Sequence, residues 1–309
     1  MLYKSRLESL LSSNRFVVTC ELGPPRGSNA QTLTEKVVCV RDYCDAINVT
    51  DSACGVPSLD TLASSVIVIQ SGTEPVMQIS GRDRNRIQLQ SLLYGAYALG
   101  VRNVLFVTGD HLVAGFHVPA RTVFDFDSIQ GLEIARILMG GIDLAGEELD
   151  GAPQFYLGAT FDPYEKPIEN QLSRLRRKHD AGAEFFQTQA IFDLSGFEDF
   201  MGRIDDLDIH VLAGVVPVRS PEAAEFMNQF VPGLSVPQKI IDRIVCAGAG
   251  LEEEEQQEAY LEEAVSIAVE TIHRVRRIDG VSGIHIMAVG CEEVVPEIVR
   301  RAGLFPRPR

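Results

Sequence analysis

Eight short apolar runs are spaced along the 309 residues of this chain, and nearly every run is followed by a segment with helical spacing. The runs are rich in β-branched residues, which is typical of buried strands. The predicted strands cover 16–21, 45–51, 74–80, 103–108, 155–161, 185–190, 210–217 and 283–289. Strands that alternate with helices form parallel sheets, and eight such units predict a single-domain (βα)8 TIM barrel over residues 1–309. An open doubly wound sheet is the alternative, but no G-x-G-x-x-G follows the first strand.

Helical spacing between and after these runs defines the outer elements of the predicted barrel. The predicted helices cover 2–13, 29–43, 58–71, 85–99, 129–139, 165–181, 195–206, 237–246, 252–277 and 292–302, with one more beginning at Ser220-Pro221. Ser128 is the expected N-cap of the helix over 129–139. Residues 111–127 lack clear periodicity, and a loop of that length is more often functional than idle. We assign no role to its histidines, His111 and His117.

Composition and charge exclude several classes of protein. The net charge is −15 and the sequence pI is about 4.9, which argues against nucleic acid as a partner. No apolar run is long enough to span a membrane, and the first residues lack the apolar core of a signal peptide, so we expect a cytoplasmic protein. The six cysteines form no CxxC pair, which favours free thiols and no metal site.

The stretch Cys20-Glu21-Leu22-Gly23-Pro24-Pro25 marks the end of the first predicted strand. The glycine and the two prolines force the chain out of the strand directly after Glu21. Ligands bind at the carboxyl ends of the strands in parallel α/β folds, which makes Glu21 a candidate catalytic residue. The alternative is a surface glutamate, because a single carboxylate before a turn is common.

Polar residues recur at the carboxyl ends of the other predicted strands, and these ends converge on one face of a barrel. They are Thr50-Asp51, Gln78 with Ser80, Thr108-Gly109-Asp110, Ala159-Thr160 and Thr188-Gln189. Together with Glu21 they predict a pocket that binds a heterocycle and contains two carboxylates.

Two basic clusters follow predicted strands. Arg174, Arg176, Arg177 and Lys178 lie on the helix over 165–181, and Arg82, Arg84 and Arg86 follow the third strand. Adjacent guanidinium and ammonium groups suit a diphosphate, so either cluster is a candidate phosphate clamp. The alternative for the cluster on the helix over 165–181 is a solvated helix face.

An ordered set of these residues resembles the methylenetetrahydrofolate reductase family over nearly the whole chain. The resemblance is carried by Glu21 with Pro24-Pro25, Val49-Thr50, Gly109-Asp110, Leu172 to Ala183, Thr188-Gln189 with Phe192-Asp193, Gly214 to Val218, and Gly283 to Gly290. It implies a (βα)8 barrel that holds a flavin at the carboxyl ends of its strands. The implied reaction reduces 5,10-methylenetetrahydrofolate to 5-methyltetrahydrofolate by hydride transfer from the reduced flavin.

The resemblance also implies roles for individual residues. Glu21 matches the general acid that helps to open the methylene bridge, Asp110 matches a carboxylate near flavin and pterin, and Gln189 matches a pterin-binding glutamine. With Ser80 from the strand ends and Arg82 from the second basic cluster, the candidate cofactor-binding residues are Thr50, Gln78, Ser80, Arg82, Thr108, Gly109, Asp110, Ala159, Arg174, Arg177 and Lys178. FAD is the implied cofactor, with FMN left open. We expect burial beside Pro24 and Pro25 to raise the pKa of Glu21.

Departures from the family pattern bear on the electron donor. Leu22-Gly23 stands where an aromatic residue usually follows the glutamate, Thr108 replaces an arginine, and Gln78 replaces a histidine. With Arg82-Asp83-Arg84-Asn85, these changes resemble the branch from acetogens and related anaerobes. The reductase of that branch often works with a zinc- and iron-sulfur-containing subunit, so the donor is NADH or such a partner, and we expect an oligomer.

Two other functions stay open at this point. A non-catalytic flavin- or pterin-binding subunit of a larger complex is one, although Glu21 argues against it because simple electron transfer needs no acid. A cobalamin-linked methyltransferase barrel is the other, and the sequence disfavours it because a thiolate-metal pattern is missing.

Overall fold

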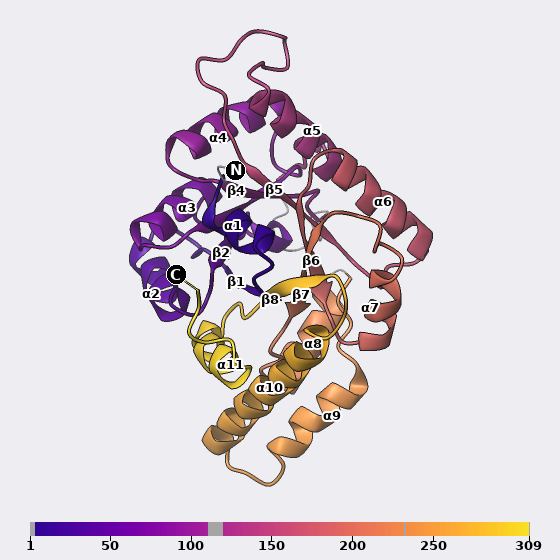
Figure 1. Cartoon of the computed structure of the whole chain (residues 1–309). Coiled ribbons are helices and arrows are strands. Elements are labelled where there is room, and N and C mark those ends of the chain that lie inside the picture. Colours follow the sequence, from indigo (N-terminus) through magenta and orange to yellow (C-terminus); the bar gives the residue numbers. More distant parts are fainter. Residues whose placement is uncertain (1–3, 111–119, 232, 309) are drawn as a thin grey trace.

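The computed structural model describes residues 4–110, 120–231 and 233–308, so His111 and His117 lie outside the described residues. Eight parallel strands close into a barrel in sequence order, with helices around them (Figure 1). The strands are β1 (Val17–Leu22), β2 (Ala46–Val49), β3 (Pro75–Ser80), β4 (Asn103–Val107), β5 (Tyr156–Phe161), β6 (Phe185–Ala190), β7 (His210–Val215) and β8 (Val281–Ile286). Because β1 pairs with β8, the TIM barrel is confirmed and the open sheet is excluded.

The helices follow the predicted order with shifts at their ends. They are α1 (Arg6–Ser12), α2 (Ala30–Val40), α3 (Thr61–Gln70), α4 (Arg86–Ala98), α5 (Ser128–Met139), α6 (Ile168–Asp180), α7 (Leu194–Met201), α8 (Pro221–Phe230), α9 (Gln238–Ala247), α10 (Glu253–Val275) and α11 (Val295–Arg301), with short 3₁₀ turns η1 (Ala53–Gly55) and η2 (Glu292–Val294). Ser220 caps α8 as predicted. The predicted N-cap Ser128 is wrong, because Asp127 and Gln130 form a capping box that starts α5 one residue earlier.

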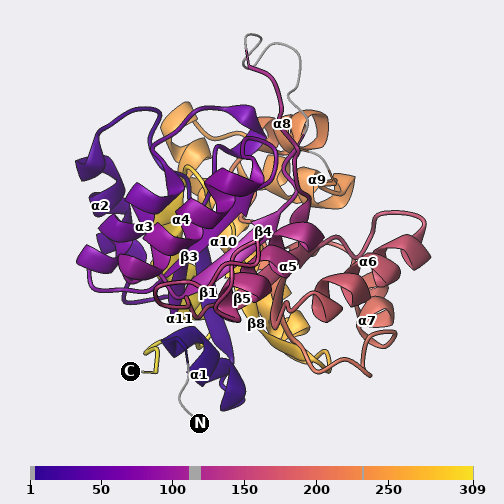
Figure 2. The same ribbon diagram turned by 90° about the horizontal axis from the view of Figure 1, so that it is seen from above.

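The interior of the barrel is apolar at its amino-terminal end. One inward residue from each of seven strands packs there with Leu7 and Leu11 of α1, which covers this end (Figure 2). These residues are Val17, Ala46, Val76, Leu105, Tyr156, Phe185 and Leu212. Gly158 leaves room for the ring of Phe185, because a Cβ at Gly158 would lie 2.2 Å from the ring's Cζ. This packed layer closes the amino-terminal end, so any ligand site in the barrel lies toward the opposite end.

The chain ends are tied to the same end of the barrel by the buried carboxylate of Asp45. Its Oδ2 accepts a hydrogen bond of 2.9 Å from the Val18 N–H and one of 3.1 Å from Nε of Arg307. Arg6 of α1 lies 3.3 Å from the other oxygen, Oδ1. One carboxylate therefore joins α1 and the carboxyl-terminal segment to β1.

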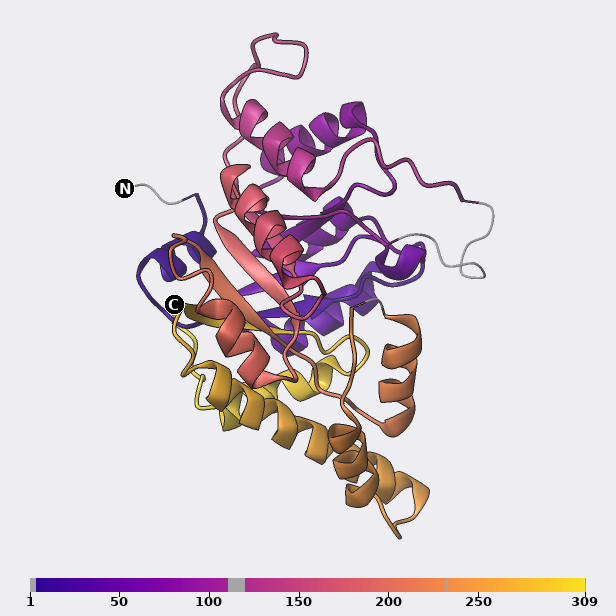
Figure 3. The same ribbon diagram turned by 90° about the vertical axis from the view of Figure 1, so that its right-hand side faces the viewer.

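The helices after β7 extend beyond the ring of the barrel. α9 and α10 pack against each other at its edge (Figures 1 and 3). Arg243 of α9 joins the two helices through ion pairs of 2.6 Å with Glu263 and 2.8 Å with Glu270. Within the described part of the chain, none of the helices combines the length and apolar character needed to cross a membrane.

Candidate active site

Glu21 is the next-to-last residue of β1 and points into the carboxyl-terminal half of the barrel, where its side chain is 19% exposed. Gln78 of β3 donates a hydrogen bond of 2.9 Å from Nε2 to Oε2 of Glu21. Nε2 of His285, on β8, lies 3.6 Å from the same oxygen. The carboxyl group is thus held by the neighbouring strand β8 and by β3, two strands away on the other side, and it stays partly open to a ligand.

These partners change the acidity of Glu21. Burial acts to raise the pKa of its carboxyl, but hydrogen bonding and charge from His285, with the hydrogen bond from Gln78, outweigh it and lower the pKa. The expected raised pKa is therefore wrong for the protein without a ligand. The expectation considered the prolines after Glu21 and missed a histidine that lies 264 positions later in the chain.

A chain of buried side chains continues from His285 across the barrel. Nδ1 of His285 lies 2.9 Å from Oγ1 of Thr19, and Gln187 donates to the same hydroxyl over 3.3 Å. Gln187 and Asn48 exchange two amide hydrogen bonds of 2.6 and 3.0 Å. Buried polar groups need such partners, so the network fixes the orientation of the His285 ring.

Sequence reasoning missed Thr19, Asn48, Gln187 and His285, although a signal was present. Alternate residues of a strand face the same side, and each of the first three precedes a predicted strand-end residue by two positions. The pairs are Thr19 with Glu21, Asn48 with Thr50, and Gln187 with Gln189. A polar residue two positions before a polar strand end therefore indicates a second polar layer inside the barrel.

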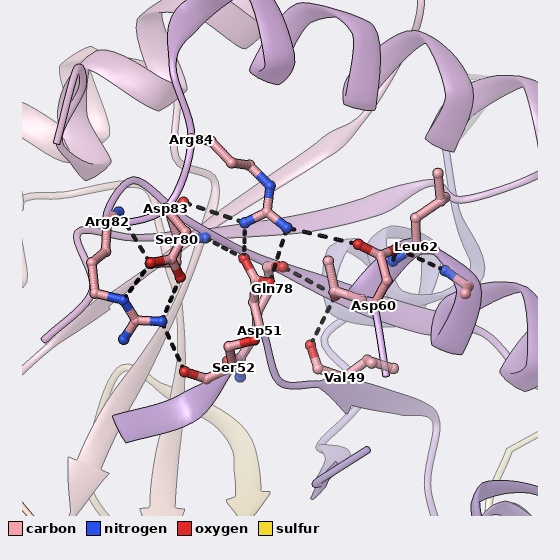
Figure 4. A network of polar contacts seen from close by, with 12 residues as sticks. Val49, Asp51, Ser52, Asp60, Leu62, Gln78, Ser80, Arg82, Asp83 and Arg84 are labelled. Atoms are coloured by element: carbon pink, nitrogen blue, oxygen red, sulfur yellow. Dashed lines mark hydrogen bonds and ion pairs between the residues drawn. The ribbon is translucent and has the colours of Figure 1, made fainter. Parts of the chain in front are cut away.

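The arginines after β3 hold the loop that follows β2 (Figure 4). Both nitrogens of the Arg84 guanidinium bond the carboxylate of Asp51, whose Oδ2 also accepts from Ser80 N at 2.8 Å. Arg82 is buried, pairs with its neighbour Asp83, and donates to the carbonyl of Ser52 over 2.9 Å. Both guanidinium groups already have carboxylate partners, so this cluster stabilises the loop more than it presents free charge to a phosphate.

The loop held by Arg82 has a strained backbone. Ser52 and Cys54 have φ values of 48° and 53°, a region that costs non-glycine residues about 1–3 kcal/mol. The strain places Cys54 where it interacts electrostatically with Asp110, Arg82 and Glu21. Burial, followed by the charge of Asp110, raises the pKa of its thiol, which therefore stays neutral near pH 7.

Gly109 allows β4 to approach β3 closely at the same face. Its φ is 89°, and a Cβ there would lie 2.3 Å from Oγ of Ser80 and 2.8 Å from Cβ of Arg82. The neighbouring Thr108 hydroxyl accepts from Ser128 N over 3.3 Å and so joins β4 to the start of α5. Asp110, which follows, is exposed at the rim.

The basic cluster on α6 divides into two parts. Arg176 pairs with Asp206 at 2.6 Å, which leaves it a structural role on the outside. Lys178 instead reaches the carboxyl end of β5, where Nζ donates to the Thr160 carbonyl over 2.6 Å. Burial, with the charge of Arg174, lowers the pKa of Lys178 to about 8. Asp127 and Glu165 act in the opposite direction but do not outweigh these two effects. A buried cation whose charge is destabilised by a second cation suits an anionic ligand.

The remaining predicted residues lie at the same end of the barrel. Gln189, the next-to-last residue of β6, lies near Gly233 of the loop after α8, and Asp162, which directly follows β5, faces the same glycine. Burial raises the pKa of Asp162, a carboxylate that sequence reasoning also missed. Thr50 and Ala159 are buried, and Arg174 and Arg177 are exposed. No group of three or more His, Cys, Asp or Glu side chains in the described ranges could hold a metal ion.

Comparison with known proteins places this barrel in a family. The family described as "Methylenetetrahydrofolate reductase" matches residues 6–303. Methylenetetrahydrofolate reductase 1 of Schizosaccharomyces pombe is 22% identical over 267 residues, which cover 84% of this chain and 41% of that protein. The probable methylenetetrahydrofolate reductase (NADPH) of Caenorhabditis elegans is 22% identical over 98% of this chain and 45% of its own length. The chain thus spans less than half the length of these relatives.

Solved structures share the fold at lower identity. An uncharacterized protein from Clostridium thermocellum that binds two copies of 5-methyl-5,6,7,8-tetrahydrofolic acid has a TM-score of 0.62 at 14% identity, and the match covers 96% of this chain and 97% of that one. DmoA from Hyphomicrobium sulfonivorans has a TM-score of 0.54 at 11% identity, covering 93% and 88%. With a family match across nearly all of its residues, this chain belongs to the methylenetetrahydrofolate reductase family.

Proposed function

We propose that this protein is a flavin-dependent reductase that converts 5,10-methylenetetrahydrofolate to 5-methyltetrahydrofolate. The observation that carries the proposal is the half-open carboxyl of Glu21, held by Gln78 and His285 at the carboxyl end of the barrel. Family membership and a structural neighbour that binds methyltetrahydrofolate support a folate substrate. A scaffold subunit would not need an acid in this position.

The residues around the site fit a flavin nucleotide. Lys178 reaches the end of β5, and none of the described carboxylates is bonded to its ammonium group. Arg174 is loosely paired, at 3.9 Å from Glu165. These two cations can bind the phosphate of FMN or the diphosphate of FAD.

The chain's own groups can perform the acid chemistry of this reaction. A bound reduced flavin supplies the hydride. The substrate carbon accepts a hydride poorly until N10 is protonated and the methylene bridge opens, so the site needs a proton donor. A folate that covers the open edge of Glu21 removes its remaining water, which favours the protonated carboxyl and prepares it to donate. We assign binding of the pterin to Gln189 and Asp110, as the resemblance to the family implies.

Glu21→Gln tests this role directly. We expect the variant to fold and to retain flavin, while folate reduction falls roughly 10²–10⁴-fold because the proton donor is lost. Flavin reduction by an artificial donor should be unchanged. Glu35→Gln, on the exposed side of α2, is the matched control and should keep full activity. Near-normal folate reduction by Glu21→Gln would remove Glu21 from this role.

We further propose that a partner subunit, rather than NADH alone, reduces the flavin efficiently. Gly23 has no side chain, so this position close to Glu21 offers no aromatic surface for a nicotinamide. The Gln78 amide is already bonded to Glu21. The net charge of −15 suits a partner with a basic docking surface.

A further inference from the structure

The second contact of Glu21 has a consequence for how the acid receives its proton. His285 is 2% exposed and lies inside the barrel, so its ring has no free access to water. Its two nitrogens face different partners: Nε2 lies 3.6 Å from Oε2 of Glu21, and Nδ1 lies 2.9 Å from Oγ1 of Thr19. A buried histidine between a hydroxyl and a candidate acid can exchange a proton with that acid.

The Thr19–Nδ1 distance fits either tautomer of His285, and we assign the proton on Nδ1 from the other hydrogen bonds of Thr19. The Thr19 hydroxyl donates to the carbonyl of Ile284 over 3.3 Å, which uses its single proton. It therefore accepts from Gln187 and, with its remaining lone pair, from Nδ1–H of His285. This arrangement stays satisfied whether or not Nε2 also carries a proton, so His285 can change its charge without any rearrangement of its neighbours.

We propose that His285 is a positioning residue that shares one proton with Glu21 and loads the acid internally when folate binds. This inference rests on the proposed function. In this proposal the shared proton lies on Nε2 of His285 before folate binds. When folate covers the site, Nε2 of His285 and Oε2 of Glu21 close from 3.6 Å to hydrogen-bond distance, and the proton moves to Glu21, which leaves a neutral imidazole and a carboxylic acid. The total number of protons is unchanged, and no electrons move.

The energetics favour this direction. Excluding water penalises two charges more than two neutral groups, so a bound folate favours the neutral pair. The acid then gives its proton to the substrate nitrogen, and the pair regains one proton from solvent after the site reopens. The lowered pKa of Glu21 is consistent with a charged pair in the protein without a ligand.

The other groups that face this pair do not compete for the proton. Gln78, on β3, does not titrate. Cys20, on β1, and Cys54, in the loop after β2, are thiols. Hydrogen bonding to Cys44 and burial raise the pKa of Cys20, and burial raises that of Cys54. Two further charged groups, Arg82 and Asp110, interact with Cys54. Glu292 interacts with Cys20, and its carboxylate is paired with the ammonium group of Lys36 at 2.7 Å.

Infrared titration of the Glu21 carboxylic acid band tests the proposal in the protein without folate. The band is assigned by its loss in Glu21→Gln. In His285→Gln, which keeps an N–H donor but cannot be charged, we expect the midpoint of the band to move upward by about one pH unit or more, because hydrogen bonding alone then opposes the effect of burial. His210→Gln is the matched control, since His210 lies beside Ser282 at the other end of the strands.

Thr19→Val provides a second route if His285→Gln does not fold. Without the hydroxyl the imidazolium loses a partner at Nδ1, so the midpoint should move in the same direction by a smaller amount. The proposal is overturned if the midpoint of the Glu21 band stays unchanged in whichever of His285→Gln and Thr19→Val fold. The measurement requires neither folate turnover nor flavin, so a protein that failed to reduce folate could still confirm the proton sharing.

Discussion

The charge of Lys178 depends on its surroundings, so the proposed flavin site can be tested through the pH dependence of flavin binding. Burial, with the charge of Arg174, lowers its pKa from 10.5 to about 8. A phosphate that bonds Nζ stabilises the charged ammonium and opposes both effects. Binding of FAD or FMN should therefore depend on pH in a range where the phosphate groups are already fully ionised.

The sign and size follow from the pKa. Below about pH 8 the ammonium is charged and attracts the phosphate, and as the pH rises through this value the charge is lost. About nine-tenths of Lys178 is charged at pH 7 and about one-tenth at pH 9, so flavin affinity should fall about tenfold between these values. Full recovery of the ordinary pKa in the complex corresponds to about 3 kcal/mol of added binding free energy.

Three variants separate this effect from other pH effects. The dissociation constants of FAD and FMN are measured on flavin-free protein from pH 6.5 to 9.5 at constant ionic strength. Lys178→Met should bind weakly with no step near pH 8, and Lys178→Arg should bind without the step because its charge persists. Arg176→Met removes a cation that pairs with Asp206 and should behave as the unaltered protein. An unchanged affinity and pH step in Lys178→Met would refute the assignment.

Two further predictions concern other parts of the chain. Stopped-flow reduction of the flavin by NADH should be slow for the isolated chain and fast with a co-purified partner; fast, saturable reduction by NADH alone would contradict the partner proposal. Asp45→Asn should lower the free energy of unfolding by about 3–5 kcal/mol, because the largely buried Arg307 loses its counter-charge. Urea unfolding measures this loss, and a value near zero would show that the pair contributes little.

The fold could be predicted because each strand and helix is indicated by a short continuous stretch of the sequence. A buried parallel strand appears as a short apolar run, and a helix after each run requires a parallel crossover, so eight repeats leave few architectures. Errors fall at element ends, where tertiary contacts decide. The helix predicted over 195–206 ends at Met201, and α5 starts at a cap formed by Asp127 rather than Ser128.

The candidate site could be predicted only where a residue lies near the carboxyl end of a strand. Glu21, Gln78 and Gln189 lie within the last three residues of their strands, and the closed barrel brings these ends to one face. The role of His285 was missed because it depends on the pairing of β1 with β8. In that pairing Thr19 lies opposite His285. That pairing closes the barrel between the two ends of the chain, and no local pattern in the sequence expresses it.

Gln78 connects the departures from the family pattern to the chemistry of the acid. Where the resemblance would place a histidine, this chain has an amide that donates to Glu21 over 2.9 Å. An amide keeps a second N–H and a carbonyl oxygen for other contacts, so it can bond a flavin and Glu21 at once. Because the amide does not titrate, His285 is the one ionisable group among the two described partners of Glu21. With Gln78 in place of a histidine, the described partner of Glu21 that can carry a proton is His285 on β8. The titration of Glu21 in His285→Gln therefore measures the effect of this one ionisable partner.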